Sequence, residues 1–129
     1  WRVATAGSSD DMGLDGQAAY SICPRGWRLP TASGDGPIGD FQTLIVAGFI
    51  GSDVVKLTSA PYYFVRGGIV SPSVDLLYYN VGSEGGYWSS SSWSGDTISY
   101  ALMFNSTELI HSAYSYGWER GVSVRCIAR

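Results

Sequence analysis

The residues of this sequence that could take part in catalysis stand in no recognisable catalytic arrangement. His111 is the one histidine, so a Ser–His–Asp or Cys–His arrangement has a single candidate base, in a polar stretch where a solvated imidazole is the usual state. Asp10, Asp11 and Asp15 are candidate calcium ligands, but their spacing fits no EF-hand loop. We therefore expect no catalytic residue, no metal site and no cofactor, and we interpret the chain as a non-enzyme.

The two cysteines, Cys23 and Cys126, leave two interpretations open. They are either unrelated buried thiols or one disulfide that ties the early chain to its last segment. A bridge closing so long a loop stabilises a fold by roughly 4–5 kcal/mol in the chain-entropy model. Disulfides persist in oxidising compartments, so a bridge predicts an extracellular or cell-surface location. The sequence starts at Trp1 and has no transmembrane run, so we expect any membrane link to lie in a missing N-terminal segment.

Composition and charge narrow the class of protein. A chain of 129 residues fits a single domain, 1–129, and with 45% hydrophobic and 15% charged residues it is not intrinsically disordered. The 8 Lys and Arg residues are scattered singly and the formal net charge is −3, so we expect no nucleic-acid partner. The 17 glycines, 9 tyrosines and 5 tryptophans are typical of a loop-rich fold and equally of recognition loops.

Hydrophobic periodicity predicts an α+β fold. A helix is expected to begin at Asp40 as N-cap and to end at Gly48 or Gly51, with its buried face formed by Phe41, Leu44 and Ile45. Over 98–105 the residues alternate, which predicts a strand. Ile98, Tyr100, Leu102 and Phe104 share the face predicted to point inward, and Ser99, Ala101, Met103 and Asn105 share the outward one. A last strand is expected with Val122, Val124 and Cys126 on one face and Ser123 and Arg125 opposite.

Three strings carry a resemblance to a known family: CPRGWRLPT at 23–31, GYWSSS at 86–91 and GVSVRC at 121–126. In this order they resemble the "Fibrobacter succinogenes major paralogous" (FISUMP) domain of bacterial surface and pilus-associated proteins. The Arg-Leu-Pro-Thr string is also similar to one in formylglycine-generating-enzyme-like proteins, which have a C-type lectin fold. The resemblance implies a C-type-lectin-like domain with a central antiparallel sheet, one or two helices, long loops and a disulfide Cys23–Cys126. The catalytic cysteine pair of those enzymes and the Glu-Pro-Asn or Gln-Pro-Asp triplet of calcium-dependent lectins have no counterpart here.

The stretch 92–120 is similar to the variable region of proteins diversified by diversity-generating retroelements, which use the same fold. Its inward positions keep an apolar alternation, whereas its outward positions hold a mixture of residue types, as an ordinary solvent-exposed face also would. We expect Trp88 and Tyr100 to lie in the core. The candidate ligand-binding residues are Trp93, Asp96, Ala101, Met103, Asn105, Thr107, Glu108, Ile110, Ser112, Tyr114, Tyr116, Trp118 and Glu119.

Three functions remain, in order of preference. The first is a surface-displayed, adhesin- or receptor-type domain, monomeric in this form, that binds an unidentified protein or glycan through 92–120. The second is a structural subunit of a pilus or other surface appendage without a dedicated ligand. The third is a remnant of the formylglycine-generating type of enzyme.

Overall fold

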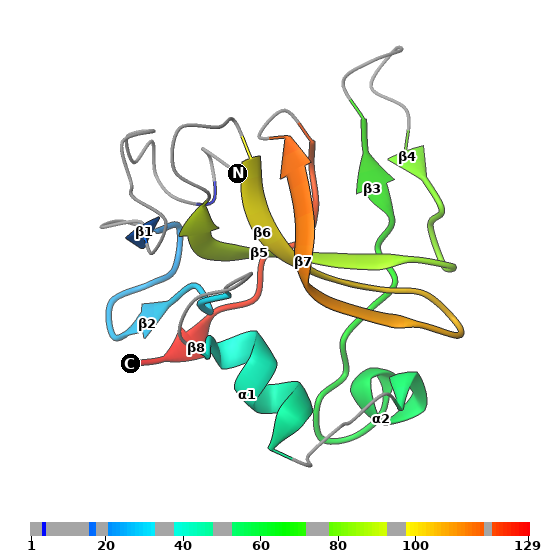
Figure 1. The fold of residues 1–129 in the computed structure, drawn as a ribbon, viewed down its shortest axis with the longest axis horizontal. Helices are drawn as coiled ribbons and strands as arrows, with labels where there is room; N and C mark the ends of the chain where they lie inside the picture. The colour runs from blue at the N-terminus through cyan, green and yellow to red at the C-terminus, as the bar shows by residue number, and fades with distance from the viewer. Residues whose placement is uncertain are drawn as a thin grey trace.

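In the computed structural model of the chain, a four-stranded antiparallel sheet lies at the centre (Figure 1). The structure describes residues 4, 16–17, 21–32, 38–47, 53–71, 78–92, 98–117 and 120–129, and only the backbone of 16–17, Ile98 and 110–117. The predicted candidate calcium ligands Asp10, Asp11 and Asp15 and the predicted helix ends Gly48 and Gly51 lie outside the described residues.

The elements form a mixed α+β fold with antiparallel pairing. The central sheet has the order β1 (Gly16–Gln17), β5 (Gly85–Ser92), β6 (Ile98–Phe104), β7 (Leu109–Gly117). Two small sheets pair β2 (Trp27–Arg28) with β8 (Ile127–Ala128), and β3 (Ile69–Val70) with β4 (Tyr78–Tyr79). Helices α1 (Asp40–Val46) and α2 (Val54–Thr58) lie on the same side of the central sheet (Figure 1). A disulfide joins Cys23 and Cys126, which confirms the predicted bridge and the coarse fold class.

Helix α1 confirms the predicted helix but corrects its start. Phe41 and Ile45 are buried and Leu44 is partly buried, as the i, i+3, i+4 spacing predicted. The N-cap is Gly39 and not Asp40, and no side chain caps the helix. Asp40 is the first helical residue, because its carboxylate is held by other partners, described below.

Helix α2 was not expected from the sequence, because five residues are too few to show a helical period. Its N-cap is Asp53, whose side chain accepts hydrogen bonds from the backbone N–H of Val55 (2.9 Å) and Lys56 (3.2 Å). Val54 and Leu57 are buried against the same core as α1.

Strand β6 is buried on both faces, and this is the main correction to the prediction from the sequence. The predicted inward residues Tyr100, Leu102 and Phe104 do pack in a core with residues of both helices and of the segment that follows α2. The predicted outward residues Ala101 and Met103 are only 0% and 4% exposed. They form a second core on the opposite face of the sheet, with Ala4, Leu29, Ile69 and Trp88. The expected burial of Trp88 and Tyr100 is confirmed.

Two glycines allow β5 to run between these cores. A Cβ atom on Gly85 would overlap the ring of Phe104, in the first core. A Cβ atom on Gly86 would lie 2.7 Å from Sδ of Met103 and 2.8 Å from Cγ1 of Val122, on the opposite face. Any larger residue would push β5 away from β6 or from the C-terminal segment. The glycine that opens the GYWSSS string is therefore a packing requirement.

The C-terminal segment is less regular than the predicted strand. Gly121 pairs with Val70, and Ser123 pairs with Tyr87 in the parallel sense, as isolated bridges before β8 begins. Val122 packs against the second core, whereas Val124 is 37% exposed, so burial does not extend along the predicted face of the two valines.

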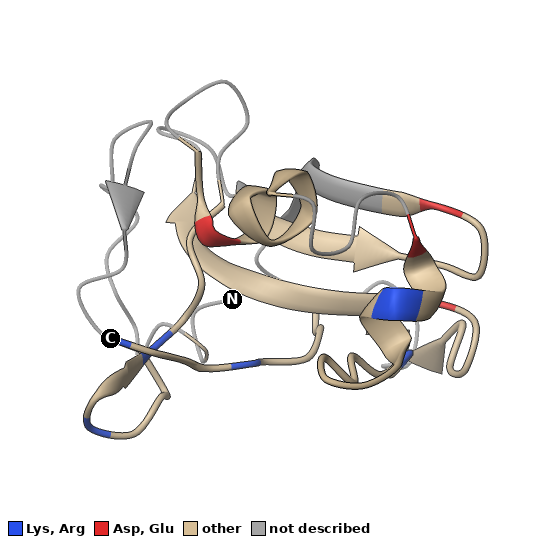
Figure 2. Ribbon diagram, turned by 90° about the horizontal axis from the view of Figure 1, so that it is seen from below, with Lys and Arg blue, Asp and Glu red and all other residues tan. Residues whose placement is uncertain are grey.

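Lys and Arg residues are spread over several separate elements (Figure 2).

Candidate ligand-binding surface

The residues predicted to bind a ligand do not form one surface in the described part of the chain. Ala101 and Met103 belong to the second core, so their predicted exposure is wrong. The physical reason is that residues far away in sequence, such as Leu29 and Val122, cover the face of β6 that the local alternation left open. Trp93, Asp96, Trp118 and Glu119 lie outside the described residues, and Ile110, Ser112, Tyr114 and Tyr116 are described only as backbone of β7.

Asn105, Thr107 and Glu108 form the turn between β6 and β7. The side-chain oxygen of Asn105 accepts hydrogen bonds from the backbone N–H groups of Thr107 and Glu108, both at 2.7 Å, and from the Thr107 hydroxyl at 3.0 Å. Asn105 therefore has a structural role in closing the hairpin. Thr107 and Glu108 are exposed. This turn lies at the far end of β6 from Ile98, and seven residues of strand span roughly 20 Å (Figure 1).

The other end of the sheet brings together the residues that flank two aromatic-containing segments. Ser92 pairs with Gly16 on one side and with Ser99 on the other, and Ile98 pairs with Gly117. We call this set of residues, Gly16, Ser92, Ile98, Ser99 and Gly117, the sheet end. Residues 93–97 connect Ser92 to Ile98, and residue 118 follows Gly117 directly. The chain therefore enters and leaves both segments at the sheet end.

Serine hydroxyls stabilise an irregularity in β5 just before the sheet end. The pairing with β6 shifts between Trp88 and Ser92. Within it the Ser89 hydroxyl donates to the Tyr100 carbonyl (2.8 Å) and accepts from the backbone N–H of Ser91 (3.1 Å). Beside it, the hydroxyls of Ser92 and Ser99 are buried and have no hydrogen-bond partner within the described residues. The serines of the GYWSSS string thus replace ladder contacts that the shifted strand loses.

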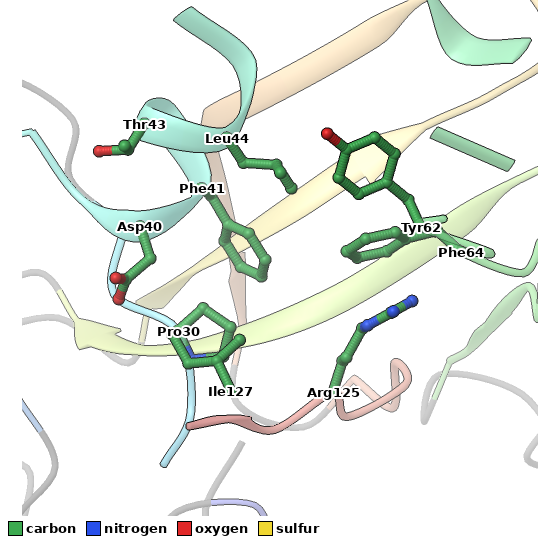
Figure 3. Close-up of a pocket in the computed structure, with 9 residues that line it drawn as sticks. All are labelled: Pro30, Asp40, Phe41, Thr43, Leu44, Tyr62, Phe64, Arg125 and Ile127. Atoms are coloured by element: carbon green, nitrogen blue, oxygen red, sulfur yellow. The ribbon is translucent and has the colours of Figure 1, made fainter. Parts of the chain in front are cut away.

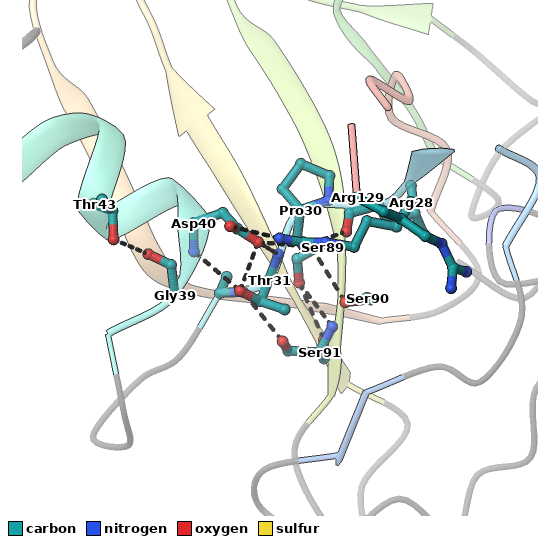
Figure 4. A network of polar contacts seen from close by, with 12 residues as sticks. Arg28, Pro30, Thr31, Gly39, Asp40, Thr43, Ser89, Ser90, Ser91 and Arg129 are labelled. Atoms are coloured by element: carbon teal, nitrogen blue, oxygen red, sulfur yellow. Dashed lines mark hydrogen bonds and ion pairs between the residues drawn. The ribbon is translucent and has the colours of Figure 1, made fainter. Parts of the chain in front are cut away.

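The segment that contains the CPRGWRLPT string is hydrogen-bonded to the same stretch of β5 (Figure 4). The Ser90 N–H donates to the Pro30 carbonyl (2.8 Å), and the N–H of Ala32, the residue directly after the string, donates to the Ser91 hydroxyl (3.1 Å). Two residues earlier in the same strand, the Trp88 N–H donates to the Ser123 carbonyl (3.0 Å) of the GVSVRC string. The three strings therefore meet at β5, and their role in the described structure is to support the sheet.

Arg28 and Asp40 form the charged part of this support (Figure 4). The guanidinium of Arg28 donates to both carboxylate oxygens of Asp40, with Nη2–Oδ1 at 2.9 Å. The carboxylate also accepts from the backbone N–H of Thr31 (2.7 Å) and from its hydroxyl (2.8 Å). Burial of Asp40 by itself would raise the pKa of the carboxyl group, but the hydrogen bonds from Arg28 and Thr31 outweigh it and lower the pKa to about 2.

Replacing Asp40 by asparagine should therefore destabilise the protein in a pH-dependent way. Because the pair is part-exposed, we expect a loss of about 1–2 kcal/mol in the free energy of unfolding at neutral pH. The pKa of Asp40 is lowered from 3.8 to about 2, so its contribution is complete above pH 3.8 and disappears as the pH falls to about 2. Urea titrations over this pH range should give free energies of unfolding for the two proteins that converge as the pH falls to about 2.

A matched control for this experiment is Asp53→Asn, because asparagine caps a helix as well as aspartate does. This variant should leave stability nearly unchanged. If the difference in the free energy of unfolding between Asp40→Asn and the parent stayed constant down to about pH 2, the role of the charged carboxylate would be contradicted.

The described residues hold no free thiol and no cluster of metal-binding side chains. Both cysteines are in the disulfide, and no group of three or more His, Cys, Asp or Glu among the described residues is placed to hold a metal ion. The side chain of His111 lies outside the description. No helix in the described ranges is long and apolar enough to cross a membrane.

Comparison of the chain with protein-family models, curated proteins and solved structures gives no match. The FISUMP and C-type-lectin-like resemblance therefore rests on the three strings alone.

One pocket in the described structure was missed by the reasoning from the sequence (Figure 3). It has a volume of about 360 Å³ and lies between α1, the segment 62–64 and the C-terminal segment 125–127. Arg125, expected only as part of the last strand, stacks on the ring of Phe64 with its guanidinium carbon 4.3 Å from the ring centre. No local signal marks such a pocket, because its walls come from segments more than half the chain apart.

Proposed function

We propose that this chain is a non-enzymatic recognition domain, displayed on a cell surface or secreted, which binds a protein or glycan at the sheet end. The observation that carries the proposal is the strand register. Ser92, Ile98 and Gly117 lie together, so residues 93–97 and the residues after Gly117 attach to the same end of one sheet. These two segments contain Trp93 and Trp118.

The residue types of these segments suit recognition. Tryptophan and tyrosine are enriched at the energetic centres of interfaces, because they bury a large rigid area at low entropy cost. Serine, glycine and asparagine neighbours supply adaptable hydrogen bonds. The sequence has Ser94 and Gly95 beside Trp93, and Ser115 and Gly117 close to Trp118.

The rigid part of the fold next to the sheet end is well suited to hold a binding surface. Strands β5 and β6 are buried on both faces, and the disulfide and the Arg28–Asp40 pair connect distant parts of the chain. A binding surface on such a support loses little conformational entropy when a ligand binds. The disulfide also agrees with an oxidising, extracellular-type environment.

The resemblance to FISUMP domains and to retroelement-diversified proteins makes this proposal more specific. In such a protein the scaffold stays constant while the ligand-contacting residues vary. We propose that 93–97 and the β7 residues 110–117 with 118–119 are the variable positions. Ala101 and Met103 are removed from that set because they are core residues.

Sequencing this gene across its source population tests the proposal without knowledge of the ligand. We expect substitutions to concentrate in 93–97 and in alternate positions of 110–119. Ala101 and Met103 should stay fixed because they belong to the second core, and Gly85 and Gly86 because a Cβ atom there would overlap core side chains. Substitutions spread evenly over the chain would contradict a diversified binding surface. They would favour an appendage subunit, for which the exposed side chains of Tyr78, Tyr79 and Val81 are candidate contacts between copies.

A further inference from the structure

The pocket beside α1 is separate from the sheet end and combines an apolar interior with one cation. Its most deeply buried residues are Pro30, Phe41 and Phe64. Leu44 and Tyr62 stand on one side of it, and Ile127 on the other (Figure 3). At about 360 Å³ it falls within the size range of small-molecule sites. An occupant must therefore present a compact apolar body to these walls.

Arg125 supplies the charge. One face of its guanidinium lies over the Phe64 ring, which leaves the N–H groups, in the plane of the guanidinium, available to an acceptor. Among the described residues no carboxylate pairs with Arg125. Stacking on an aromatic ring fixes the direction of the guanidinium and so prepares it to bind a carboxylate through two parallel hydrogen bonds.

The acidic residue of the pocket does not compete for this role. The Asp40 carboxylate is bound by Arg28 and by the N–H and hydroxyl of Thr31, so its charge is already compensated. Among the described residues, the charge at the pocket that has no counter-ion is the positive charge of Arg125. The complementary ligand is therefore an anion and not a cation.

We propose that this pocket binds a small hydrophobic carboxylic acid, with its aromatic or branched apolar group against Phe41, Phe64 and Leu44 and its carboxylate on Arg125. The volume sets the apolar part at about the size of one phenyl-bearing side chain.

Isothermal titration with 3-phenylpropionate tests this inference, and 3-phenylpropionamide serves as the uncharged analogue of the same shape. We expect the acid to bind with a Kd of about 1 mM, as for a fragment of this size, and the amide at least about tenfold more weakly. Equal affinity of acid and amide, or no heat from the acid at several times this concentration, would overturn the proposal.

Two variants locate the site. Arg125→Gln should weaken binding of the acid by about tenfold and leave the amide unchanged, whereas Arg25→Gln, an exposed residue with the same loss of charge, should change neither. Leu44→Trp should fill the pocket and abolish binding of both compounds. Thermal melts of each variant show whether the fold is retained, and Leu44→Trp tests the site even where Arg125→Gln lowers stability. Undiminished binding to folded Leu44→Trp would refute the assignment.

Discussion

Replacing Cys23 and Cys126 by alanine should lower the free energy of unfolding by about 4–5 kcal/mol, because the bridge closes a loop with a sequence separation of 103 residues. A domain of this size is stable by only about 5–15 kcal/mol, so the loss is a large part of the total. The bridge also holds the C-terminal segment where Ser123 pairs with Tyr87 and Val122 packs on the second core. Urea denaturation of the parent and the double variant gives the difference directly.

Reduction provides the control for this prediction. A reducing agent should shift the unfolding midpoint of the parent to that of the double alanine variant, and should leave the variant itself unchanged. Equal midpoints for the oxidised parent and the variant would show that the bridge does not stabilise the fold.

The replacement Ala101→Glu should destabilise the protein by at least about 4 kcal/mol, enough to prevent folding of a marginal domain. Ala101 is 0% exposed, and its neighbours in the second core are apolar. A carboxylate at this position would be buried without a partner. The loss of far-ultraviolet dichroism or of a cooperative urea transition measures the effect.

Two further variants separate charge from size and from position. Ala101→Leu adds similar bulk without charge and should cost about 1–3 kcal/mol through overpacking. Ser106→Glu adds the same charge at the exposed turn between β6 and β7 and should change stability by no more than about 0.5 kcal/mol. A mild effect of Ala101→Glu, equal to that of Ser106→Glu, would mean that this face of β6 is open to solvent.

The two faces of β6 show which part of the fold could be predicted from the sequence. The alternation of Tyr100, Leu102 and Phe104 marks one buried face without ambiguity, because large apolar residues recur at the strand period. Ser99 and Ala101 are small and give no such signal. The burial of Ala101 depends on Leu29 and Val122, which local periodicity in 98–105 cannot reveal.

Helix α1 shows the same limit at a shorter range. Asp40 has the residue type and the position that predict an N-cap. In the structure its side chain binds Arg28 and Thr31 instead, and Gly39 is the N-cap residue. A charged partner twelve residues earlier outweighs the local preference.

For the candidate site, the sequence identified aromatic-rich segments but not their relation in space. That relation depends on the register of β5, β6 and β7, which is shifted by irregularities between Trp88 and Ser92 and between Ala101 and Met103. Such shifts change which residues reach the sheet end and which reach the turn. They depend on hydroxyl contacts such as that of Ser89 with the Tyr100 carbonyl, which no sequence period encodes.

The covalent link between Cys23 and Cys126 also determines how the protein responds to mechanical tension. A pull applied to the chain before Cys23 and after Cys126 passes directly through the two sulfur atoms. The loop between them, with a sequence separation of 103 residues and with β5, β6 and β7 inside it, lies outside this covalent path. Strand β1 lies before Cys23 and pairs with β5, and β8 lies after Cys126 and pairs with β2, so tension at the chain ends loads these two pairings first. The pairing of β5, β6 and β7 with one another would persist for as long as the bridge is oxidised.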